Sequence, residues 1–250
     1  MKTPSDPAWE SFTVSAAEQD VQLNDATVRV FQAYTTALQE VSFNITAIRD
    51  TQAIIAKILL DSLAMLAPVA VADNMDVSEL RQQSWRALDL GSGTGAPGIP
   101  WQIVCPEMQF TLVDSIRKKV DFLNTVSQTL ALGTVAIAAR AETLGHEPVH
   151  REQYHLVMAR AVAALPTLAE YTLPFVHIGG LVALPKGPKA HEECSAAQSA
   201  ISKLGGELLG IFPLSVPGDD VERTLVLLRK TQSTPSNYPR RIGIPTKRPL

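Results

Sequence analysis

Apolar residues are spaced as in helices over the N-terminal part of the chain. From residue 14 to residue 70 they recur at intervals of three and four positions, which predicts helices that pack by one face. Pro68 is expected to end this block, because proline interrupts a helix interior. A polar, acidic link over residues 73–83 follows. We therefore expect an N-terminal helical extension, residues 1–80, and a second unit, residues 81–250.

The remaining chain alternates short apolar runs with helical segments. Repeated strand–helix units of this kind build a parallel sheet with helices on both faces, joined by right-handed crossovers. The predicted strands are residues 86–90, 110–114, 134–137, 155–159 and 181–184.

Two further apolar runs, Glu207–Phe212 and Thr224–Leu228, break this rhythm. The residues between them have no helical period and include Pro217 and Gly218. A parallel pair needs a crossover of roughly a dozen residues or more, usually helical, so this turn-rich link predicts an antiparallel hairpin. The expected fold is an α/β, Rossmann-like sheet of seven strands whose last strand is antiparallel, preceded by the helical extension.

The composition fits a globular protein whose charge is unevenly distributed. Of 250 residues, 46% are hydrophobic and 19% are charged, which excludes a disordered chain. The net charge of −3 argues at first against a nucleic-acid partner. However, residues 223–250 carry seven basic and no acidic side chains, and the first 222 residues carry −10. We expect an acidic body with a basic binding edge; a solvated polar terminus is the alternative.

Cysteine spacing and the N-terminal sequence narrow the class further. Cys105 and Cys194 are isolated from one another and from paired histidines, so neither a metal site nor a disulfide framework is predicted. The N-terminus lacks a basic region followed by an apolar run, and no stretch approaches roughly 18 consecutive apolar residues. We expect a cytoplasmic protein with no membrane partner.

The glycine-rich segment after the first predicted strand is the most informative motif. It runs from Asp89 to Gly98 and opens a helix, so its amides should face a ligand at the carboxyl end of the sheet. Gly93, Gly95 and Gly98 satisfy the dinucleotide fingerprint. Asp114 follows about 20 residues later, as a ribose-binding carboxylate would. This pattern alone allows a nicotinamide cofactor.

Other details of the same loop favour a methyl donor. Gly91, Gly93 and Gly95 have G-x-G-x-G spacing directly after an acidic strand end, which resembles motif I of the seven-strand, class I methyltransferases. Pro97 and Pro100 remove backbone donors that a pyrophosphate would use, whereas S-adenosylmethionine carries no phosphate. We expect S-adenosylmethionine as the cofactor. A nicotinamide cofactor and a glycine turn without a ligand are the alternatives.

Two carboxylates at strand ends have expected roles in such a site. Asp89 would anchor the loop or reach the amino acid portion of the ligand. Asp114 would accept hydrogen bonds from both ribose hydroxyls, and its alternative role is to cap the helix that follows Ser115.

Further motifs continue to the end of the chain. They are Asn44–Ile48, Asp61–Leu63, Asp89–Pro100, Thr111–Ser115 with Lys118 and Lys119, Arg140–Glu142, Ala159–Ala161, Lys186–Gly187 and Tyr238–Pro245. Together they resemble the bacterial small-subunit ribosomal RNA guanine-N7 methyltransferases, also called the glucose-inhibited division protein B family. The Arg-Ala pair at 160 and the Pro-Arg-Arg-x-Gly-x-Pro ending are the most family-specific pieces.

The resemblance implies roles for individual residues. Gly91 and Ala96 would line the donor site, Ala141–Glu142 would meet the adenine, and Arg160 would contact the donor or the target. The chain departs from the family at two positions. Ala96 stands where a bulky apolar residue is common, and Ile58 where a histidine is common, which puts in doubt the packing on the donor and a shared role for that helix.

The implied activity is methyl transfer from S-adenosylmethionine to N7 of a specific guanine in 16S ribosomal RNA. Guanine N7 has a free lone pair, so no general base is needed and no catalytic residue is assigned. Arg160 and Lys186 are candidates near the target base. The alternatives are a class I methyltransferase acting on another RNA, a small molecule or a protein, a nicotinamide oxidoreductase, and an RNA-binding module with a vestigial donor site.

The C-terminal residues are expected to contact RNA phosphates, with a tyrosine available for base stacking. The expected partner is 16S rRNA, in the 30S subunit or its assembly intermediate, and the protein is expected to act as a monomer. The RNA-binding candidates are Arg229, Lys230, Tyr238, Arg240, Arg241, Lys247 and Arg248.

Overall fold

One mixed sheet forms the centre of the molecule. The computed structural model describes residues 6–160, 162–216 and 219–250, without the side chains of 219–221. The seven strands have the order β3-β2-β1-β4-β5-β7-β6, and β7 runs antiparallel to both of its neighbours. The expected sheet with a reversed last strand is therefore confirmed. The strands are β1 (Arg86–Leu90), β2 (Gln109–Asp114), β3 (Val135–Ala138), β4 (Tyr154–Ala159), β5 (Val176–Lys186), β6 (Gly206–Val216) and β7 (Asp219–Lys230).

The helices fall into an N-terminal group and a group inserted between or after the strands. The N-terminal group is α1 (Pro7–Ala17), α2 (Asp25–Glu40), α3 (Thr51–Ile54), the π-helical turn η1 (Ile55–Leu60), α4 (Asp61–Leu63), α5 (Leu66–Ala72) and α6 (Val77–Arg81). The second group is α7 (Gly98–Val104), α8 (Arg117–Thr129), α9 (Ala141–Leu144), α10 (Leu165–Thr172), the 3-10 turn η2 (Leu173–Phe175), α11 (Ala190–Lys203) and α12 (Ile244–Lys247).

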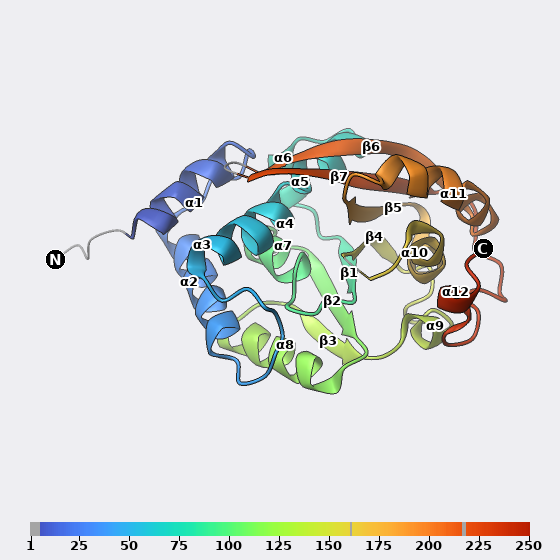
Figure 1. The fold of residues 1–250 in the computed structure, drawn as a ribbon, viewed down its shortest axis with the longest axis horizontal. Helices are drawn as coiled ribbons and strands as arrows, with labels where there is room; N and C mark the ends of the chain where they lie inside the picture. The colour runs from blue at the N-terminus through green and yellow to red at the C-terminus, as the bar shows by residue number, and fades with distance from the viewer. Residues whose placement is uncertain (1–5, 161, 217–218) are drawn as a thin grey trace.

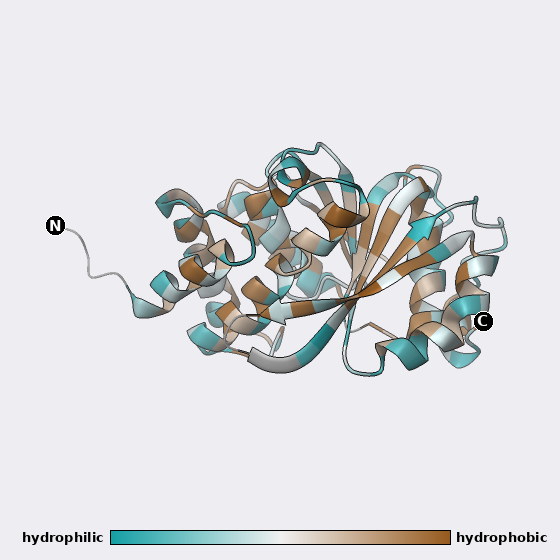
Figure 2. Cartoon of the chain, turned by 90° about the horizontal axis from the view of Figure 1, so that it is seen from above, coloured by the Kyte–Doolittle hydropathy of each residue, from teal (hydrophilic) through white to brown (hydrophobic). Residues whose placement is uncertain are grey.

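Helices cover both faces of the sheet. The N-terminal helices lie on one face with α7 and α8, and α9 to α12 lie on the other (Figure 1). Side chains of β1 alternate between the two resulting cores, since Ala87 belongs to the first and Leu88 to the second. The central strands are therefore buried on both sides and appear as apolar bands through the centre of the molecule (Figure 2), whereas the edge strands β3 and β6 are partly exposed.

The N-terminal helices are part of the first core. Phe12, Phe31 and Tyr34 are fully buried in the same hydrophobic cluster as Ala87 and Leu112 of the sheet. The run Thr51–Ala72 is long and apolar enough to cross a membrane, but 72% of its most apolar window is buried inside the protein. Its apolarity thus accompanies packing against the sheet. The division at residue 80 stays a prediction.

Two boundaries differ from the expectation. Pro68 does not end the helical block, because it lies in the first turn of α5, where its missing N–H has no intrahelical partner to lose. The polar link contains α6, whose first turn is closed by a capping box. Asp76 Oδ1 accepts the Glu79 N–H, and Glu79 Oε2 accepts the Asp76 N–H, both at 2.9 Å.

The C-terminal hairpin is longer than its apolar core suggests. Strand β6 continues to Val216 and β7 starts at Asp219, so most of the expected link is paired backbone. Pro213 is tolerated there because β6 is the edge strand of the sheet. Pro217 and Gly218, expected at the turn, lie outside the described residues.

Candidate functional site

The glycine loop after β1 needs glycine for its backbone conformation. The φ angles are +73° at Gly91, +55° at Gly93 and +101° at Gly95. A Cβ at Gly95 would lie 2.5 Å from Ile99 Cδ1, and one at Gly91 would lie 2.6 Å from Val162 Cγ2. Both positions therefore require glycine for steric reasons as well.

Most N–H groups of this loop donate to the protein itself. Their distances to the acceptors run from 2.7 to 3.1 Å, so few donors remain for a bound phosphate. The donors are the N–H groups of Gly91, Ser92, Gly93, Gly95 and Gly98, and the acceptors are the carbonyls of Ser92 and Val113 and the carboxylates of Asp89 and Asp114.

Asp89 is the buried anchor of the loop. Its Oδ2 accepts the Gly98 N–H at 3.1 Å, and its Oδ1 has no hydrogen-bond partner among the described residues. Burial raises the pKa of Asp89 to about 6, although the Gly98 amide acts in the opposite direction. Asp89 thus holds the end of the loop through the Gly98 amide, and its contact with a ligand stays a prediction.

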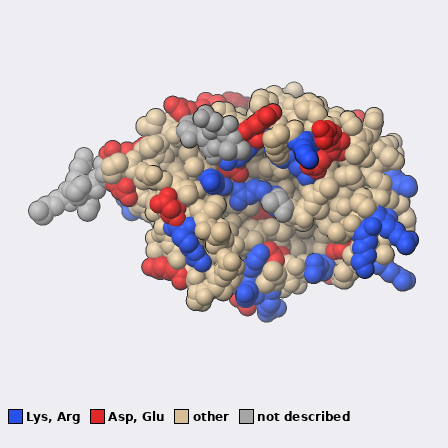
Figure 3. Space-filling view, viewed as in Figure 1, with Lys and Arg blue, Asp and Glu red and all other residues tan. Residues whose placement is uncertain are grey.

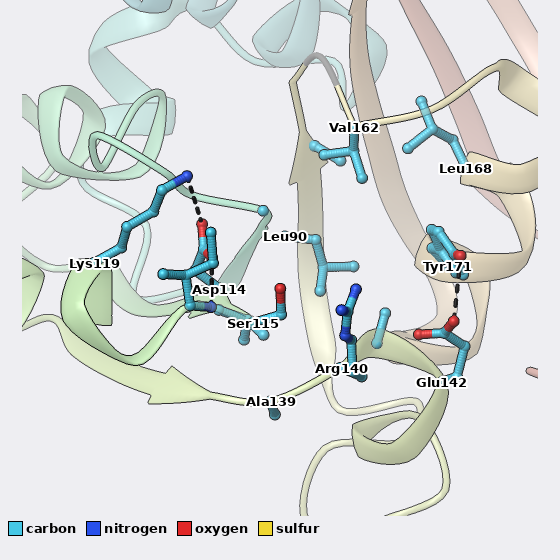
Figure 4. Close-up of a pocket in the computed structure, with 15 residues that line it drawn as sticks. Leu90, Asp114, Ser115, Lys119, Ala139, Arg140, Glu142, Val162, Leu168 and Tyr171 are labelled. Carbon is cyan, nitrogen blue, oxygen red and sulfur yellow. Dashed lines mark hydrogen bonds and ion pairs between the residues drawn. The ribbon is translucent and has the colours of Figure 1, made fainter. Parts of the chain in front are cut away.

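A cavity of about 240 Å³, here called the loop cavity, opens beside this loop (Figure 4). On one wall, Asp114 accepts the N–H groups of Gly93 and Ile116 at 3.1 and 2.9 Å, and Lys119 Nζ lies 3.7 Å from the same carboxylate. Ile116, not Asp114, is the N-cap of α8, so the alternative capping role of Asp114 is wrong. The carboxylate instead joins the loop to the start of the helix.

The opposite wall is tied to the C-terminal segment. Glu142 Oε1 accepts the Tyr171 hydroxyl at 3.3 Å and the Gly243 N–H at 3.0 Å. The Tyr171 hydroxyl also lies 2.9 Å from the Thr246 hydroxyl. Figure 4 shows Glu142 and Tyr171 across the cavity from Asp114 and Lys119. Residues far apart in the sequence thus share one wall.

The expected donor-site residues are only partly brought together. Gly91, Asp114 and Ala141–Glu142 line the loop cavity, whereas Gly93 and Gly95 shape the loop behind it. Ala96 is buried, and Arg160 lines a neighbouring cavity. Several other residues line the cavity, although no sequence motif assigns them a role. These are Leu90, Val113, Lys119, Arg140, Ala159, Val162, Leu168 and Tyr171.

Some of these unpredicted lining residues lie in recognisable sequence motifs, and others do not. Lys119 and Arg140 belong to motifs that carry the family resemblance, and Lys119 lies in the first turn of α8, shortly after the strand end at Asp114. Leu168 is buried in α10 and looks like an ordinary core position, whereas Tyr171 is half-buried and belongs to no motif. Only the packing of α10 against β4 brings them to the cavity.

A second cavity of about 380 Å³, here called the arginine cavity, lies beside the end of β4. Arg160 Nη1 donates to Asp61 Oδ2 at 2.9 Å, and Arg223 Nε lies 3.0 Å from Asp61 Oδ1. Lys186 also lines the cavity, but its Nζ donates to Glu193 at 2.8 Å and to the Ala163 carbonyl at 2.9 Å. The two candidates for the target base therefore share one cavity.

Several expected RNA contacts are structural instead. The Lys230 side chain is fully buried and pairs with Glu152, so it cannot reach RNA. Arg229 pairs with Asp73, and Arg240 pairs with the fully buried Glu170 at 2.6 Å. Tyr238 is only 8% exposed, which excludes stacking on a base in this conformation. Sequence alone could not separate these residues from exposed cations of the same segment.

The other basic candidates lie on the surface. Arg241, Lys247 and Arg248 are exposed and make no ion pair with a described residue. Lys and Arg side chains gather at the end of the molecule that carries the C-terminus, and others lie in a hollow at the centre of the same face (Figure 3). A basic edge exists, but it is smaller than the count of seven suggests.

Relatives of known name match nearly the whole chain. The family model described as rRNA small subunit methyltransferase G matches residues 27–218. A Ribosomal RNA small subunit methyltransferase G of Roseiflexus castenholzii is 40% identical over 238 residues, which are 94% of this chain and 97% of that protein. The protein of the same name from Pelotomaculum thermopropionicum is 41% identical over 244 residues, covering 96% and 98%.

Solved structures support the fold. A branched-chain polyamine synthase from Thermus thermophilus superposes with a TM-score of 0.57 at 13% identity, over 84% of this chain and 64% of that one. A 16S rRNA (adenine(1408)-N(1))-methyltransferase from Catenulisporales acidiphilia gives 0.50 at 11% identity, over 63% and 91%. These identities show a shared architecture, whereas the sequence matches are far closer and span the loop, both cavities and the sheet. The chain is thus a member of the rRNA small subunit methyltransferase G family.

Proposed function

We propose that the protein transfers a methyl group from S-adenosylmethionine to N7 of a guanine in 16S ribosomal RNA. The observation that carries this proposal is the loop cavity, which lies at the carboxyl ends of β1 to β4 in a chain of this methyltransferase family. Carboxylates stand on opposite walls of the cavity, and Gly91 of the loop belongs to its lining.

The residues of the loop cavity fit a nucleoside without phosphates. A dinucleotide would need free loop amides for its pyrophosphate, but those amides are already donated to Val113, Asp114, Asp89 and Ser92. Leu90, Val113 and Leu168 supply apolar surface for a base, and two acceptor oxygens of Asp114 suit a ribose. This donor set favours S-adenosylmethionine over a nicotinamide cofactor.

Each wall has a distinct task in binding. Asp114 accepts hydrogen bonds from the ribose hydroxyls, while the amides of Gly93 and Ile116 hold the carboxylate in place. Glu142 is held by Tyr171 and Gly243 at the other wall, beside the expected adenine position. Asp89 keeps the end of the loop in place through the Gly98 amide, and its buried Oδ1 has no hydrogen-bond partner among the described residues.

The chemistry requires positioning more than proton transfer. When bound, S-adenosylmethionine supplies a methyl group activated by its sulfonium. Guanine N7 presents a lone pair at neutral pH, so the protein has no proton to remove. Holding the two reactants in line contributes about 7–11 kcal/mol in well-oriented systems. The arginine cavity, separated from the loop cavity by the chain at Ala159 and Arg160, is the place where the guanine would lie.

The proposed substrate is ribosomal RNA in the cytoplasm, as 30S subunit or assembly intermediate, and the protein acts as a monomer. Exposed Arg241, Lys247 and Arg248 suit phosphate contacts at the rim of the molecule. The family name requires an RNA of the small ribosomal subunit as substrate, which agrees with cations outside the loop cavity.

Donor binding tests the first half of this proposal. Titration calorimetry should show binding of S-adenosylmethionine and none of NADH, and Asp114→Ala should abolish the binding because the ribose acceptors are lost. Asp121→Ala is the matched control, since it removes an exposed carboxylate that pairs with Arg117 on α8. Tight NADH binding, or equal effects of the two substitutions, would contradict the assigned donor site.

A further inference from the structure

Asp61 is the one described carboxylate that contacts two arginines of the arginine cavity. It lies 2.9 Å from Arg160 Nη1 and 3.0 Å from Arg223 Nε, and its side chain is only 9% exposed. These arginines come from the end of β4 and from β7, whereas Asp61 belongs to the N-terminal helices. The helical extension therefore sets the geometry of a cavity that the sheet alone would leave open.

The helix before Asp61 is shaped for this contact. The π-helical turn η1 ends directly before Asp61, and the carbonyl of Lys57 within it accepts a second hydrogen bond from Arg160 Nη1 at 3.2 Å. π-Helical turns occur frequently at functional sites. Arg160 Nε and Nη2 make no hydrogen bond to any residue in the described ranges, so they remain available to a ligand.

The arginine cavity has the size and the position of an acceptor site. Its volume of about 380 Å³ lies within the usual range of ligand pockets, roughly 300–1,000 Å³. Ala159 lines the loop cavity, Arg160 lines the arginine cavity, and Val162 lines the loop cavity again. The chain beside Ala159 and Arg160 thus lies between the methyl donor in the loop cavity and an acceptor base in the arginine cavity.

Given the proposed function, we propose that Asp61 is a positioning residue for the acceptor guanine. It fixes the Arg160 guanidinium through Nη1 and so sets the angle at which the free N–H groups of Nε and Nη2 donate to guanine O6, away from N7. Arginine normally binds guanine through O6 and N7 together. Because Nη1 is committed to Asp61 and Lys57, the guanidinium cannot turn to lay its Nε–Nη2 pair across O6 and N7, and N7 stays open to the methyl group.

Asp61 also offsets the positive charge that develops on the guanine during methyl transfer. Methyl transfer to N7 moves positive charge onto the purine, which two nearby guanidinium groups disfavour. The carboxylate between them reduces that repulsion without a change in their positions. Removing its charge therefore slows the reaction but leaves a more positive surface for binding polyanionic RNA.

Steady-state methylation of 30S subunits that lack the modification tests this role. Asp61→Asn should lower kcat by roughly tenfold or more, because an interaction made in the transition state is lost, while KM for the subunits is unchanged or reduced. Asp61→Glu, which keeps the charge, should recover part of kcat. Affinity for S-adenosylmethionine should equal that of the wild type in both variants.

Asp73→Asn is the matched control. Like Asp61, Asp73 joins the N-terminal helices to an arginine of β7, namely Arg229, but it lines neither cavity. It should leave kcat unchanged, and thermal melts should show that both Asn variants fold. A wild-type kcat in Asp61→Asn, a rise in KM alone, or a loss of donor affinity would overturn the inference. A wild type that methylates neither free 16S rRNA nor 30S subunits would overturn the proposed function, and this inference with it.

Discussion

Individual positions in the glycine loop differ in what they demand of the side chain. Gly95 combines a φ of +101° with a Cβ position 2.5 Å from Ile99, whereas a Cβ at Gly93, with a φ of +55°, would meet no atom closer than 3.7 Å. The sequence motif treats both glycines alike. The structure shows that one is required by packing and conformation and the other by conformation alone.

Gly95→Ala should therefore destabilise the protein more than Gly93→Ala. The left-handed conformation alone costs about 1–2 kcal/mol in Gly93→Ala. Gly95→Ala must also displace Ile99 or Leu123, which adds the cost of an overpacked core, typically 1–3 kcal/mol. Urea unfolding of both variants measures the difference. Equal losses of stability would show that the loop can relax around the new methyl group.

Lys230 should give stability a distinct pH dependence. Burial lowers the pKa of Lys230 to about 8, while Glu152 acts in the opposite direction. Between pH 8 and the ordinary value of 10.5, the unfolded chain binds more protons at this residue than the folded one, so its contribution to stability rises with pH. The free energy of unfolding of the wild type, minus that of Lys230→Met, should therefore increase by roughly 2–3 kcal/mol over this pH range. A difference that stays constant or falls would contradict the lowered pKa.

Among the elements, the C-terminal segment, residues 231–250, is held to the second face of the sheet by several side chains, of which Arg151 makes the most contacts with backbone carbonyls. Arg151 donates to the carbonyls of Gly145, Thr234, Pro235 and Tyr238 at 2.7 to 3.2 Å. The same segment supplies Gly243 and Thr246 to the wall of the loop cavity. The C-terminal segment, which carries exposed cations, thus also supports one wall of the loop cavity.

Arg151→Lys should loosen this segment and weaken donor binding at a distance. A lysine cannot bridge the spread carbonyls, because it lacks the planar guanidinium fork. Amide hydrogen exchange should accelerate over residues 231–250, and affinity for S-adenosylmethionine should fall several-fold. Arg117→Lys, on an 81% exposed side chain, is the control and should change neither. Faster exchange with unchanged donor affinity would show that the segment does not support the cavity wall.

The elements also show which features the sequence could predict. Short apolar runs located all seven strands, and the short link before Thr224 predicted the reversed one. The pattern missed α6 because that helix is short and held by its capping box. It could not locate the π-helical turn before Asp61, which has the same apolar spacing as an α-helix.

At the scale of the whole molecule, the charge asymmetry is mostly neutralised within the fold. Arg223, Arg229, Lys230 and Arg240 pair with acidic residues of the body, which leaves three exposed cations near the C-terminus. Counts of charge along the sequence predict a basic edge, but acidic partners that are distant in the sequence decide which of these cations reach solvent. The same limit applied to Arg160, whose partner Asp61 lies 99 positions away.

Replacing Arg241, Lys247 and Arg248 with alanine should weaken RNA binding and make that binding less dependent on salt. Three lost phosphate contacts would reduce the slope of log K against log salt by about 2–3. Donor affinity should not change, since these side chains line no part of the loop cavity. The control removes Arg29, Arg117 and Lys203, which are exposed elsewhere. An equal loss of RNA affinity in both triple variants would show that binding depends on the net charge of the protein and not on the C-terminal cations. Arg240→Ala is unsuitable for this test, because it strands the buried Glu170.

The most direct test of the account is to identify the methylated atom. 30S subunits that lack the modification are incubated with the protein and methyl-labelled S-adenosylmethionine, and the 16S rRNA is then digested to nucleosides and separated by mass spectrometry. We predict that the label appears as 7-methylguanosine from a single site, in the wild type and not in Asp114→Ala. Label in another base, at another guanine atom, or in ribosomal protein would contradict methyl transfer to guanine N7.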